Sequence, residues 1–509
     1  MTSEGSSMGE SQALAASIVD VNVCIGPDIP SDRSTDAADV VELQNRFNIG
    51  RSFVRSSTAI RVSRKAGNQA VLELGHTDRL SAVVVASTLH LDSLAAELAA
   101  AAKAGAKAVW LEGGNWTTES EANKRLIRVA GHTGLPLLAP HRQPGDASAL
   151  GRLTAGIDTP VVLVDARYPD FADVLAALDR YHNLHIETSS LGSYQAIESI
   201  TRVTGPELVL YGSGAPVGTP LSPINAILQA KISDAEKQTI FGGNAARIFG
   251  LELGPTTRLQ MVTPDRLFDV HGHVFPAPWE VPDQASTSLL DQLAGYGIRK
   301  QVASSVPAIM GDLETGNGQT VSACKLNPDQ LGYLVANPND VALAKDHIMR
   351  WGDSPGIVGI KIHAEGSAVP TRSSRMNHLF DVLADYGRPV KIHNAGDGWE
   401  RALIEIAQKH PQLPIIIAHA GFHRPQPSSG LVVSESSNVY IELASSKADI
   451  RDARELVGSV DVERVLFGSD APLINPAFVI GLYQDLGLED RALQRIYWEN
   501  GQKLFGDYM

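Results

Sequence analysis

The chain has 509 residues, more than one ordinary hydrophobic core holds, so we expect two domains of about 250 residues each. Its formal net charge of −14, with 57 acidic against 43 basic residues, argues against nucleic acid or an anionic membrane as the main partner. It has two cysteines and no apolar run near the roughly 18 residues that span a bilayer. We therefore expect a cytoplasmic protein without a disulfide framework.

Residues 1–16 lack a basic n-region and a long apolar core, so we expect a disordered N-terminus and no signal peptide. Residues 17–250 alternate apolar, strand-like runs with segments of helical spacing. The strand candidates are IVDVNVCIG, RSFVRSS, RLSAVVVAST, AKAVWLEGG, GLPLLAPH, PVVLVDARY, LHIETSS and LVLYGSGAP. Eight strands, each followed by a helix or a helix-sized gap, predict a (β/α)8 barrel.

Residues 251–264, LELGPTTRLQMVTP, contain two prolines and little apolar periodicity, which is typical of a linker. Residues 265–509 then repeat the alternation of strands and helices. The strand candidates are RLFDVHGHVF, RKQVASSVP, QLGYLVANP, IVGIKIHAE, PVKIHNAG, PIIIAHAG, VYIELASS and RVLFGSDAP. The predicted fold class is therefore α/β, with two tandem TIM-type barrels.

The two halves are copies of one unit. YGSGAP at 211–216 and FGSDAP at 467–472 are 256 residues apart, as are IFGGNAARIFG at 240–250 and IYWENGQKLFG at 496–506. Near the start of each half, DVN at 20–22 and DVH at 269–271 are 249 residues apart. An offset that drifts smoothly indicates a duplicated domain with small loop insertions, because the period exceeds that of any solenoid repeat.

Histidines collect at the predicted strand ends of the second half. His271 and His273 are two residues apart, so they share a face of the first strand, near its carboxyl end. For such a short motif alone, hydrogen-bonded core histidines are the simpler interpretation. Four further candidates end other strands, namely His363, His393, His419 and Asp470. Together these groups would be costly to desolvate without a cation. They predict a divalent metal ion, with zinc favoured and manganese or iron as alternatives.

These motifs bring a known family into view. Asp-Val-His-Gly-His on the first strand, a histidine ending the fifth, His-Ala-Gly ending the sixth and Gly-Ser-Asp-Ala-Pro ending the eighth resemble the amidohydrolase superfamily. The pattern is similar to its amidohydrolase-related (amidohydrolase 2) branch, which includes aminocarboxymuconate semialdehyde decarboxylase and other metal-dependent hydrolases. The resemblance implies that His271, His273, His393 and Asp470 bind one divalent metal. It also implies catalytic roles for Asp470 and for His419 beside the metal.

Other residues near the strand ends are candidates for binding substrate. Lys361 and His363 share a face of the fourth strand, and Arg372, Arg375 and Arg424 follow strands four and six. An arginine there could receive a substrate carboxylate through two hydrogen bonds, although a solvated loop position is the simpler interpretation for any one of them. Lys361 could support a second metal, but pairing with a carboxylate such as Glu442 is the favoured alternative.

The first half has lost these ligands. In the repeat alignment, the positions of His271, His273, His393, His419 and Asp470 are occupied by Asn22, Cys24, Pro140, Asp165 and Gly214. Asp20 and Glu187 match Asp269 and Glu442, so we interpret these shared carboxylates as structural. The first barrel is therefore predicted to be a pseudoenzyme domain without a metal site.

The favoured function is hydrolysis of a small amide, lactone or ester by a metal-activated water in the second barrel. Asp470 would take the proton from water, and His419 would stabilise the oxyanion or assist the transfer. One alternative is a metal-dependent nonoxidative decarboxylase of an unsaturated or aromatic carboxylic acid, and another is a non-catalytic binding or scaffold protein. The expected partners are a small-molecule substrate and the other barrel of the same chain, with a homo-oligomer possible.

Overall fold

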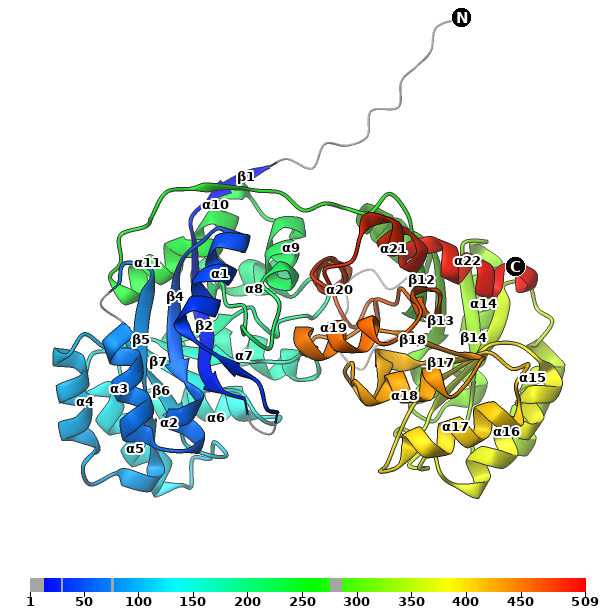
Figure 1. Cartoon of the computed structure of the whole chain (residues 1–509), viewed down its shortest axis with the longest axis horizontal. Helices are drawn as coiled ribbons and strands as arrows, with labels where there is room; N and C mark the ends of the chain where they lie inside the picture. Colours follow the sequence, from blue (N-terminus) through cyan, green and yellow to red (C-terminus); the bar gives the residue numbers. More distant parts are fainter. Residues whose placement is uncertain (1–12, 29–30, 75–76, 275–285) are drawn as a thin grey trace, which may run out of the picture.

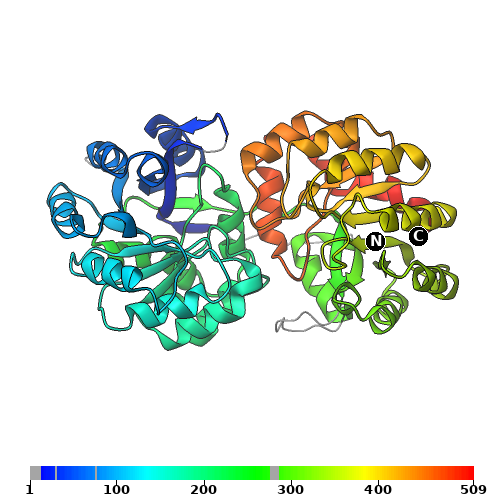
Figure 2. The ribbon, with the colours of Figure 1, turned by 90° about the horizontal axis from the view of Figure 1, so that it is seen from below.

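The computed structural model describes residues 13–28, 31–74, 77–274 and 286–509. Two barrels lie side by side and are joined by one extended segment that runs over both (Figures 1 and 2). In the described part of the chain, no helix combines the length and the apolar character needed to cross a bilayer.

The first barrel is a parallel sheet whose strands follow one another in chain order. Its strands are β2 (Ile18–Pro27), β4 (Ile49–Ser56), β5 (Leu80–Ser87), β6 (Ala108–Glu112), β7 (Leu137–Pro140), β8 (Val161–Val164), β9 (Leu184–Glu187) and β10 (Val209–Leu210). A short strand, β3 (Ser34–Thr35), pairs antiparallel with the end of β2. The barrel closes where Val21 N–H donates to Tyr211 O at 3.1 Å and Gly214 N–H donates to Asn22 O at 3.0 Å.

The second barrel repeats this order. Its strands are β12 (Leu267–Val274), β13 (Ile298–Ser305), β14 (Gln330–Ala336), β15 (Ile357–His363), β16 (Val390–His393), β17 (Ile415–Ile417), β18 (Val439–Glu442) and β19 (Val465–Leu466). It closes where Val270 N–H donates to Phe467 O at 2.9 Å and His273 N–H donates to Ala471 O at 2.8 Å. The prediction of two tandem (β/α)8 barrels is thus confirmed, and each predicted strand segment contains an observed strand.

Helices cover the outside of both barrels (Figure 1). Those of the first are α1 (Ala37–Phe47), α2 (Ser57–Arg61), α3 (Arg64–Leu74), α4 (Leu94–Lys103), α5 (Glu121–Gly131), α6 (Asp146–Thr154), α7 (Phe171–Arg180), α8 (Ala196–Thr204), α9 (Leu221–Gln229), α10 (Asp234–Gln238) and α11 (Asn244–Phe249). Those of the second are α12 (Ser286–Leu293), α13 (Val306–Ile309), α14 (Leu313–Leu326), α15 (Val341–Trp351), α16 (Ser374–Tyr386), α17 (Trp399–Lys409), α18 (Ser428–Ser434), α19 (Ile450–Gly458), α20 (Pro476–Gln484), α21 (Asp490–Gln494) and α22 (Asn500–Phe505).

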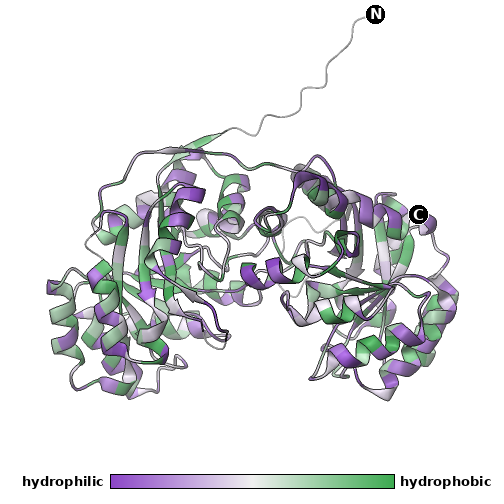
Figure 3. Ribbon diagram, viewed as in Figure 1, coloured by the Kyte–Doolittle hydropathy of each residue, from purple (hydrophilic) through white to green (hydrophobic). Residues whose placement is uncertain are grey.

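The apolar pattern of each element follows from its layer. The strands are buried on both faces, so they are apolar almost throughout, and all eight residues of β5 are buried. The helices are buried on one face only; on α5, for example, Leu126, Ile127 and Ala130 face the sheet. The hydropathy colouring shows the same contrast, with hydrophilic residues interrupting the outer helices (Figure 3).

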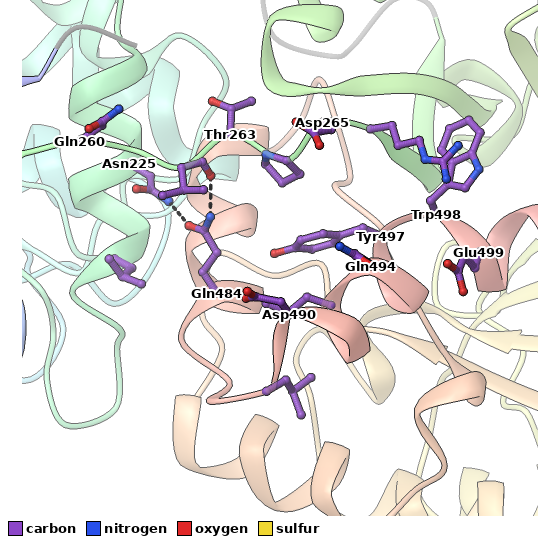
Figure 4. A pocket seen from close by; sticks show the side chains of 16 residues that line it. Asn225, Gln260, Thr263, Asp265, Gln484, Asp490, Gln494, Tyr497, Trp498 and Glu499 are labelled. Atoms are coloured by element: carbon purple, nitrogen blue, oxygen red, sulfur yellow. Dashed lines mark hydrogen bonds between the residues drawn. The ribbon is translucent and has the colours of Figure 1, made fainter. Parts of the chain in front are cut away.

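The N-terminal segment is ordered earlier than expected. Strand β1 (Leu14–Ala16) pairs antiparallel with β11 (Thr257–Leu259) of the connecting segment, and Leu14 lies opposite Leu259. Leu14 and Ala16 are buried while Ala15 is exposed. The two buried side chains on one face therefore hold this strand against the first barrel. The expectation of disorder over residues 1–16 is therefore wrong for 14–16, and its residues 1–12 lie outside the described residues. Further along, the segment passes over a cavity of about 740 Å³ (Figure 4).

The two barrels contact each other through corresponding parts of the repeat. Helices α9 and α20 pack together, and the views place both between the barrels (Figures 1 and 2). Backbone bonds join the loops on either side: Asn475 N–H donates to Gly192 O at 2.8 Å, and Ile450 N–H donates to Val217 O at 2.9 Å. Loops that follow the strands of one barrel thus lie against loops that follow the strands of the other.

Candidate metal centre

The first strand of the second barrel supplies two inward imidazoles. His271 and His273 are two residues apart on β12, and their side chains are buried. The Nδ1 of His271 lies 2.7 Å from Oε1 of Glu442, at the end of β18. An ionised carboxylate accepts hydrogen bonds and cannot donate them. This contact therefore places the proton of the His271 ring on Nδ1 and leaves Nε2 with its lone pair. Glu442 thereby orients the ring of His271.

A carboxylate from the end of the barrel faces both imidazoles. Asp470 follows β19 with a left-handed backbone at φ 60°. Its Oδ1 lies 2.8 Å from Nε2 of His273 and 3.4 Å from Nε2 of His271. Burial opposes the charge of Asp470, but the imidazoles of His271 and His273 hold its pKa well below the usual value. Ligand atoms of these three residues all lie within 4.8 Å of one another.

The fourth predicted ligand belongs to a neighbouring group. His393, at the end of β16, has its Nδ1 2.7 Å from Nε2 of His363 on β15. In a second group of potential ligands, His393 lies with Glu365 and His423, both exposed. The structure therefore brings His271, His273 and Asp470 into one cluster and His393 into an adjacent one. Glu365 and His423 were missed, because loop residues carry no periodic signal.

His419 connects the two groups. It lies in a short 3-10 turn after β17 with φ 58°, and its ring centroid is 4.9 Å from those of both His271 and His393. Its N–H donates to Oε1 of Glu442 at 2.8 Å, and its Nδ1 lies 2.6 Å from Ala444 O. A carbonyl only accepts, so Nδ1 carries a proton. Burial lowers the pKa of His419, which leaves a neutral ring whose Nε2 can accept a proton.

Two buried lysines enter the barrel from neighbouring strands. Nζ of Lys391 lies 3.1 Å from Oε1 of Glu442, so Lys391 takes the partner that we expected for Lys361. Lys361 instead has its Nζ 3.1 Å from Nε2 of His271. Burial and the charge of Lys391 lower the pKa of Lys361 to about 7. Lys391 was missed, although Lys391 and His393 repeat the spacing of Lys361 and His363.

The arginine candidates do not converge on this cluster. Arg372 and Arg375 are exposed after β15, and Arg375 donates to Asn339 Oδ1 at 2.6 Å. Arg424 is exposed after β17 and lines a cavity at the mouth of the first barrel.

The first barrel contributes a residue that no sequence motif indicates. Tyr168 follows β8 and packs against the hydrophobic core of the second barrel. Burial raises its pKa, and the negative charges of Asp470 and Glu365 raise it further. Its hydroxyl therefore lies in the electrostatic field of the candidate centre.

The donor set fits a divalent cation. Imidazole and carboxylate ligands suit zinc, manganese or iron. Two buried nitrogens of the region, Nδ1 of His273 and Nε2 of His393, have no hydrogen-bond partner among the described residues. A buried imidazole nitrogen without a partner is costly, and coordination to a cation would satisfy Nε2 of His393.

The first barrel keeps the supporting network without the ligands. Asn22 Nδ2 donates to Glu187 Oε1 at 3.3 Å, and the N–H of Asp165, which has φ 63°, donates to the same oxygen at 2.9 Å. These are the counterparts of the bonds that His271 and His419 make to Glu442. In the described part of this barrel, no three histidine, cysteine or acidic side chains gather closely enough to hold an ion.

A closed (β/α)8 barrel with imidazoles and a carboxylate at its strand ends defines a class of metal-dependent enzymes that work at the carboxyl face of the barrel. The chain belongs to the amidohydrolase family, whose model matches residues 45–251 and 268–506. The family resemblance that the sequence motifs indicated is thus confirmed, and the match extends over both halves. No curated protein matches the sequence.

Several solved structures resemble one barrel. A dihydroxybenzoic acid decarboxylase from Polaromonas sp. JS666, with bound manganese and 2-nitroresorcinol, is 14% identical, with a TM-score of 0.38 over 48% of this chain and 97% of that one. A 5-carboxyvanillate decarboxylase from Sphingomonas paucimobilis is 15% identical, with a TM-score of 0.39 over 46% and 99%. A probable 2-pyrone-4,6-dicarboxylic acid hydrolase from Acinetobacter baumannii, with citric acid bound, is 18% identical, with a TM-score of 0.38 over 47% and 99%.

Proposed function

We propose that the second barrel is a metal-dependent hydrolase of a small amide, lactone or ester. The observation that carries the proposal is the cluster of His271, His273 and Asp470 beside the neutral imidazole of His419. In this proposal His271, His273 and Asp470 hold one divalent ion, and His393 completes the set through its unpartnered Nε2. Zinc is favoured by the ligand types. The first barrel is a non-catalytic half.

A bound divalent ion would supply an activated water at neutral pH and polarise the carbonyl of the substrate. The remaining steps belong to the chain. Asp470 is ionised at neutral pH and has a second carboxylate oxygen with which to take a proton from water and pass it to the leaving group. His419 is neutral, with Nδ1–H held by Ala444 O, so Nε2 can relay the same proton, and while it is protonated the imidazolium stabilises negative charge on the substrate. This arrangement favours proton transfer over direct oxyanion binding, since a neutral Nε2 has no hydrogen to donate.

A decarboxylase is the second candidate, and one observation favours it. Lys361 is buried beside His271, with a pKa lowered to about 7, so an incoming carboxylate would favour its protonated form. A lysine held this way can orient an anionic acid while a neighbouring histidine, once protonated on Nε2, gives that proton to the carbon whose bond to the departing carbon dioxide breaks. The hydrolase role of Asp470 and His419 does not need this lysine.

The metal-loaded protein should be assayed against lactones, amides and unsaturated or aromatic carboxylic acids, with carbon dioxide measured in parallel. Hydrolysis without carbon dioxide supports the first candidate, and release of carbon dioxide with loss of the acid supports the second. The control is His347→Ala, which removes a buried histidine from α15 on the outside of the same barrel. Turnover should vanish in His271→Ala and persist in His347→Ala. Equal activity in both variants would contradict the proposed centre.

A further inference from the structure

A cavity of about 540 Å³ lies between the mouth of the first barrel and two loops of the second. Side chains at the strand ends of the first barrel line one side, among them Cys24, Arg55 and Asp165. Residues 422–424, which follow β17, and 445–448, which follow β18, line the other. Relative to its own barrel, this cavity lies where the candidate metal centre lies in the second, because Cys24 corresponds to His273. Nothing in the proposed reaction uses it.

A fixed cation occupies the mouth of the first barrel. Arg55 lies beside Cys24 in the strand register, just as Ser304 lies beside His273 in the second barrel. Its guanidinium donates to Oδ1 of Asn22 and lies 4.1 Å from the ring centroid of Trp110. Its buried Nε has no hydrogen-bond partner among the described residues. The first barrel thus replaces metal ligands with an arginine that is held in place by an amide and an aromatic ring.

The second barrel adds two more cations from the opposite wall. Arg424 and Lys447 line the cavity, and both side chains are exposed. The acidic residue of the lining is Asp165, which accepts a hydrogen bond from Ser189 Oγ at 3.2 Å. Three cations therefore face one carboxylate, in a chain whose formal net charge is −14. A concave site lined mainly by one sign of charge concentrates the opposite ion.

The rest of the lining combines serine and threonine hydroxyls with a set of apolar side chains. Phe422 and Phe478 contribute aromatic rings, and Val217 and Leu482 contribute aliphatic side chains. A ligand that satisfies this lining has an anionic group and a compact apolar body. The larger cavity under the connecting segment differs, because its charged residues are mainly acidic: Asp265, Asp490 and Glu499 outnumber Arg266 (Figure 4).

We propose that the cavity between the barrels binds a small organic carboxylate with an aromatic or branched apolar body. The carboxylate pairs with Arg55, Arg424 and Lys447, and the body packs on the two phenylalanines. The volume falls in the range of small-molecule sites, roughly 300–1,000 Å³. The site is distinct from the metal centre, because residues 422–424 form the wall between them. The rings of Phe422 and His423 have their centroids 6.3 and 5.0 Å from that of His393, so an occupant contacts the loop that adjoins the metal centre.

Cys24 offers a local readout of binding. It lines the cavity and is partly exposed, whereas Cys324 is buried. The rate at which iodoacetamide modifies Cys24 in the full-length protein should be followed by peptide mass spectrometry. Benzoate is the probe, and benzamide is its neutral isostere. Benzoate at about four times its dissociation constant should slow the modification about fivefold and saturably, and benzamide should leave it unchanged.

The double variant Arg424→Gln/Lys447→Gln should abolish protection without lowering the melting temperature, since both side chains are exposed. The control Lys345→Gln/Arg401→Gln also removes one lysine and one arginine, but from outer helices of the second barrel. In this control, benzoate should still protect Cys24. His271→Ala should also keep protection, which separates this site from the proposed metal chemistry. The inference is overturned if benzoate fails to slow the modification, if benzamide slows it equally, or if protection survives in Arg424→Gln/Lys447→Gln.

Discussion

Asn22 and His271 make the same hydrogen bond in the two barrels. Asn22 Nδ2 donates to Glu187 Oε1 at 3.3 Å, and His271 Nδ1 lies 2.7 Å from Glu442 Oε1. An asparagine amide satisfies the buried glutamate as the imidazole does, but it offers no second nitrogen on the inner side. The substitution therefore removes a candidate metal ligand and preserves the structural bond.

Metal content should follow this difference. Elemental analysis of the purified chain should find about one tightly held divalent ion, and alanine at His271 or Asp470 should empty the site, because losing one of four protein ligands removes most of the affinity. His347→Ala, which leaves the centre intact, should keep the ion. Two ions per chain, with one lost in Lys361→Ala, would instead support a dinuclear centre.

His419→Asn should separate chemistry from coordination. Asparagine tolerates the left-handed backbone at this position, so the fold should be kept. If His419 transfers a proton, the variant retains its metal but loses roughly two to four orders of magnitude in turnover. Bound metal and turnover are measured on the same preparation. Loss of metal in step with activity would make His419 a metal ligand. Normal turnover would show that His419 neither binds the metal nor transfers a proton.

Tyr168→Phe tests whether the first barrel contributes to the site of the second. Removing the hydroxyl that lies in the field of Asp470 and Glu365 should lower kcat/KM about three- to tenfold, the net value of one hydrogen bond. Metal content should not change. The matched control is Tyr181→Phe, in a tyrosine whose ring faces Gly151 within the first barrel. An equal loss in both variants would indicate a general effect on stability.

Gly192→Val should disturb the contact between the barrels. A Cβ at Gly192 would lie 2.7 Å from Cβ of Ser446 in the second barrel, so the loops must separate, at a cost of about 1–3 kcal/mol. The apolar surface of α9 and α20 would then open to water. Thermal unfolding and dye binding should report this change. Gly156→Val, at a position with open space around it, should behave like the unchanged protein.

The buried Glu187 should give the first barrel a pH-dependent stability. Burial, and then the charge of Asp165, raise the pKa of Glu187 above its ordinary value. In the repeat alignment, Leu138 occupies the position of Lys391, the lysine that pairs with Glu442 in the second barrel. The contribution of protonated Glu187 to the free energy of unfolding is fully present below its ordinary pKa near 4.5. It is lost as the pH rises through the higher pKa of the folded protein. The free energy of unfolding should therefore fall between pH 5 and pH 8. The free energy of unfolding of Glu187→Gln should fall less over the same pH range. An equal fall in both proteins would contradict this account.

The sequence was sufficient for the barrels and for most of the cluster. Strands buried on both faces must be apolar, so the parallel strands of both barrels could be identified, and the repeat offset predicted which first-barrel residues replace each candidate ligand. His271, His273 and Asp470 end strands of one barrel, so the fold alone brings them together.

Contacts between loops could not be derived in this way. Tyr168 reaches the second barrel only because loops after the strands of both barrels meet, and nothing in its local sequence indicates this. Arg424 was expected near substrate from its position after the sixth strand, but its place in the cavity depends on where the first barrel docks. The pairing of β1 with β11 joins residues more than 240 positions apart, beyond the reach of local periodicity.

The covalent joining of the barrels has a consequence for how the protein responds to dilution. Two separate subunits dissociate as their concentration falls, whereas these two halves face each other at a local concentration set by the connecting segment and its pairing with β1. Specific activity should therefore be independent of protein concentration down to the nanomolar range. The same joining fixes the ratio of one mouth with the candidate metal centre to one mouth with the arginine in every chain.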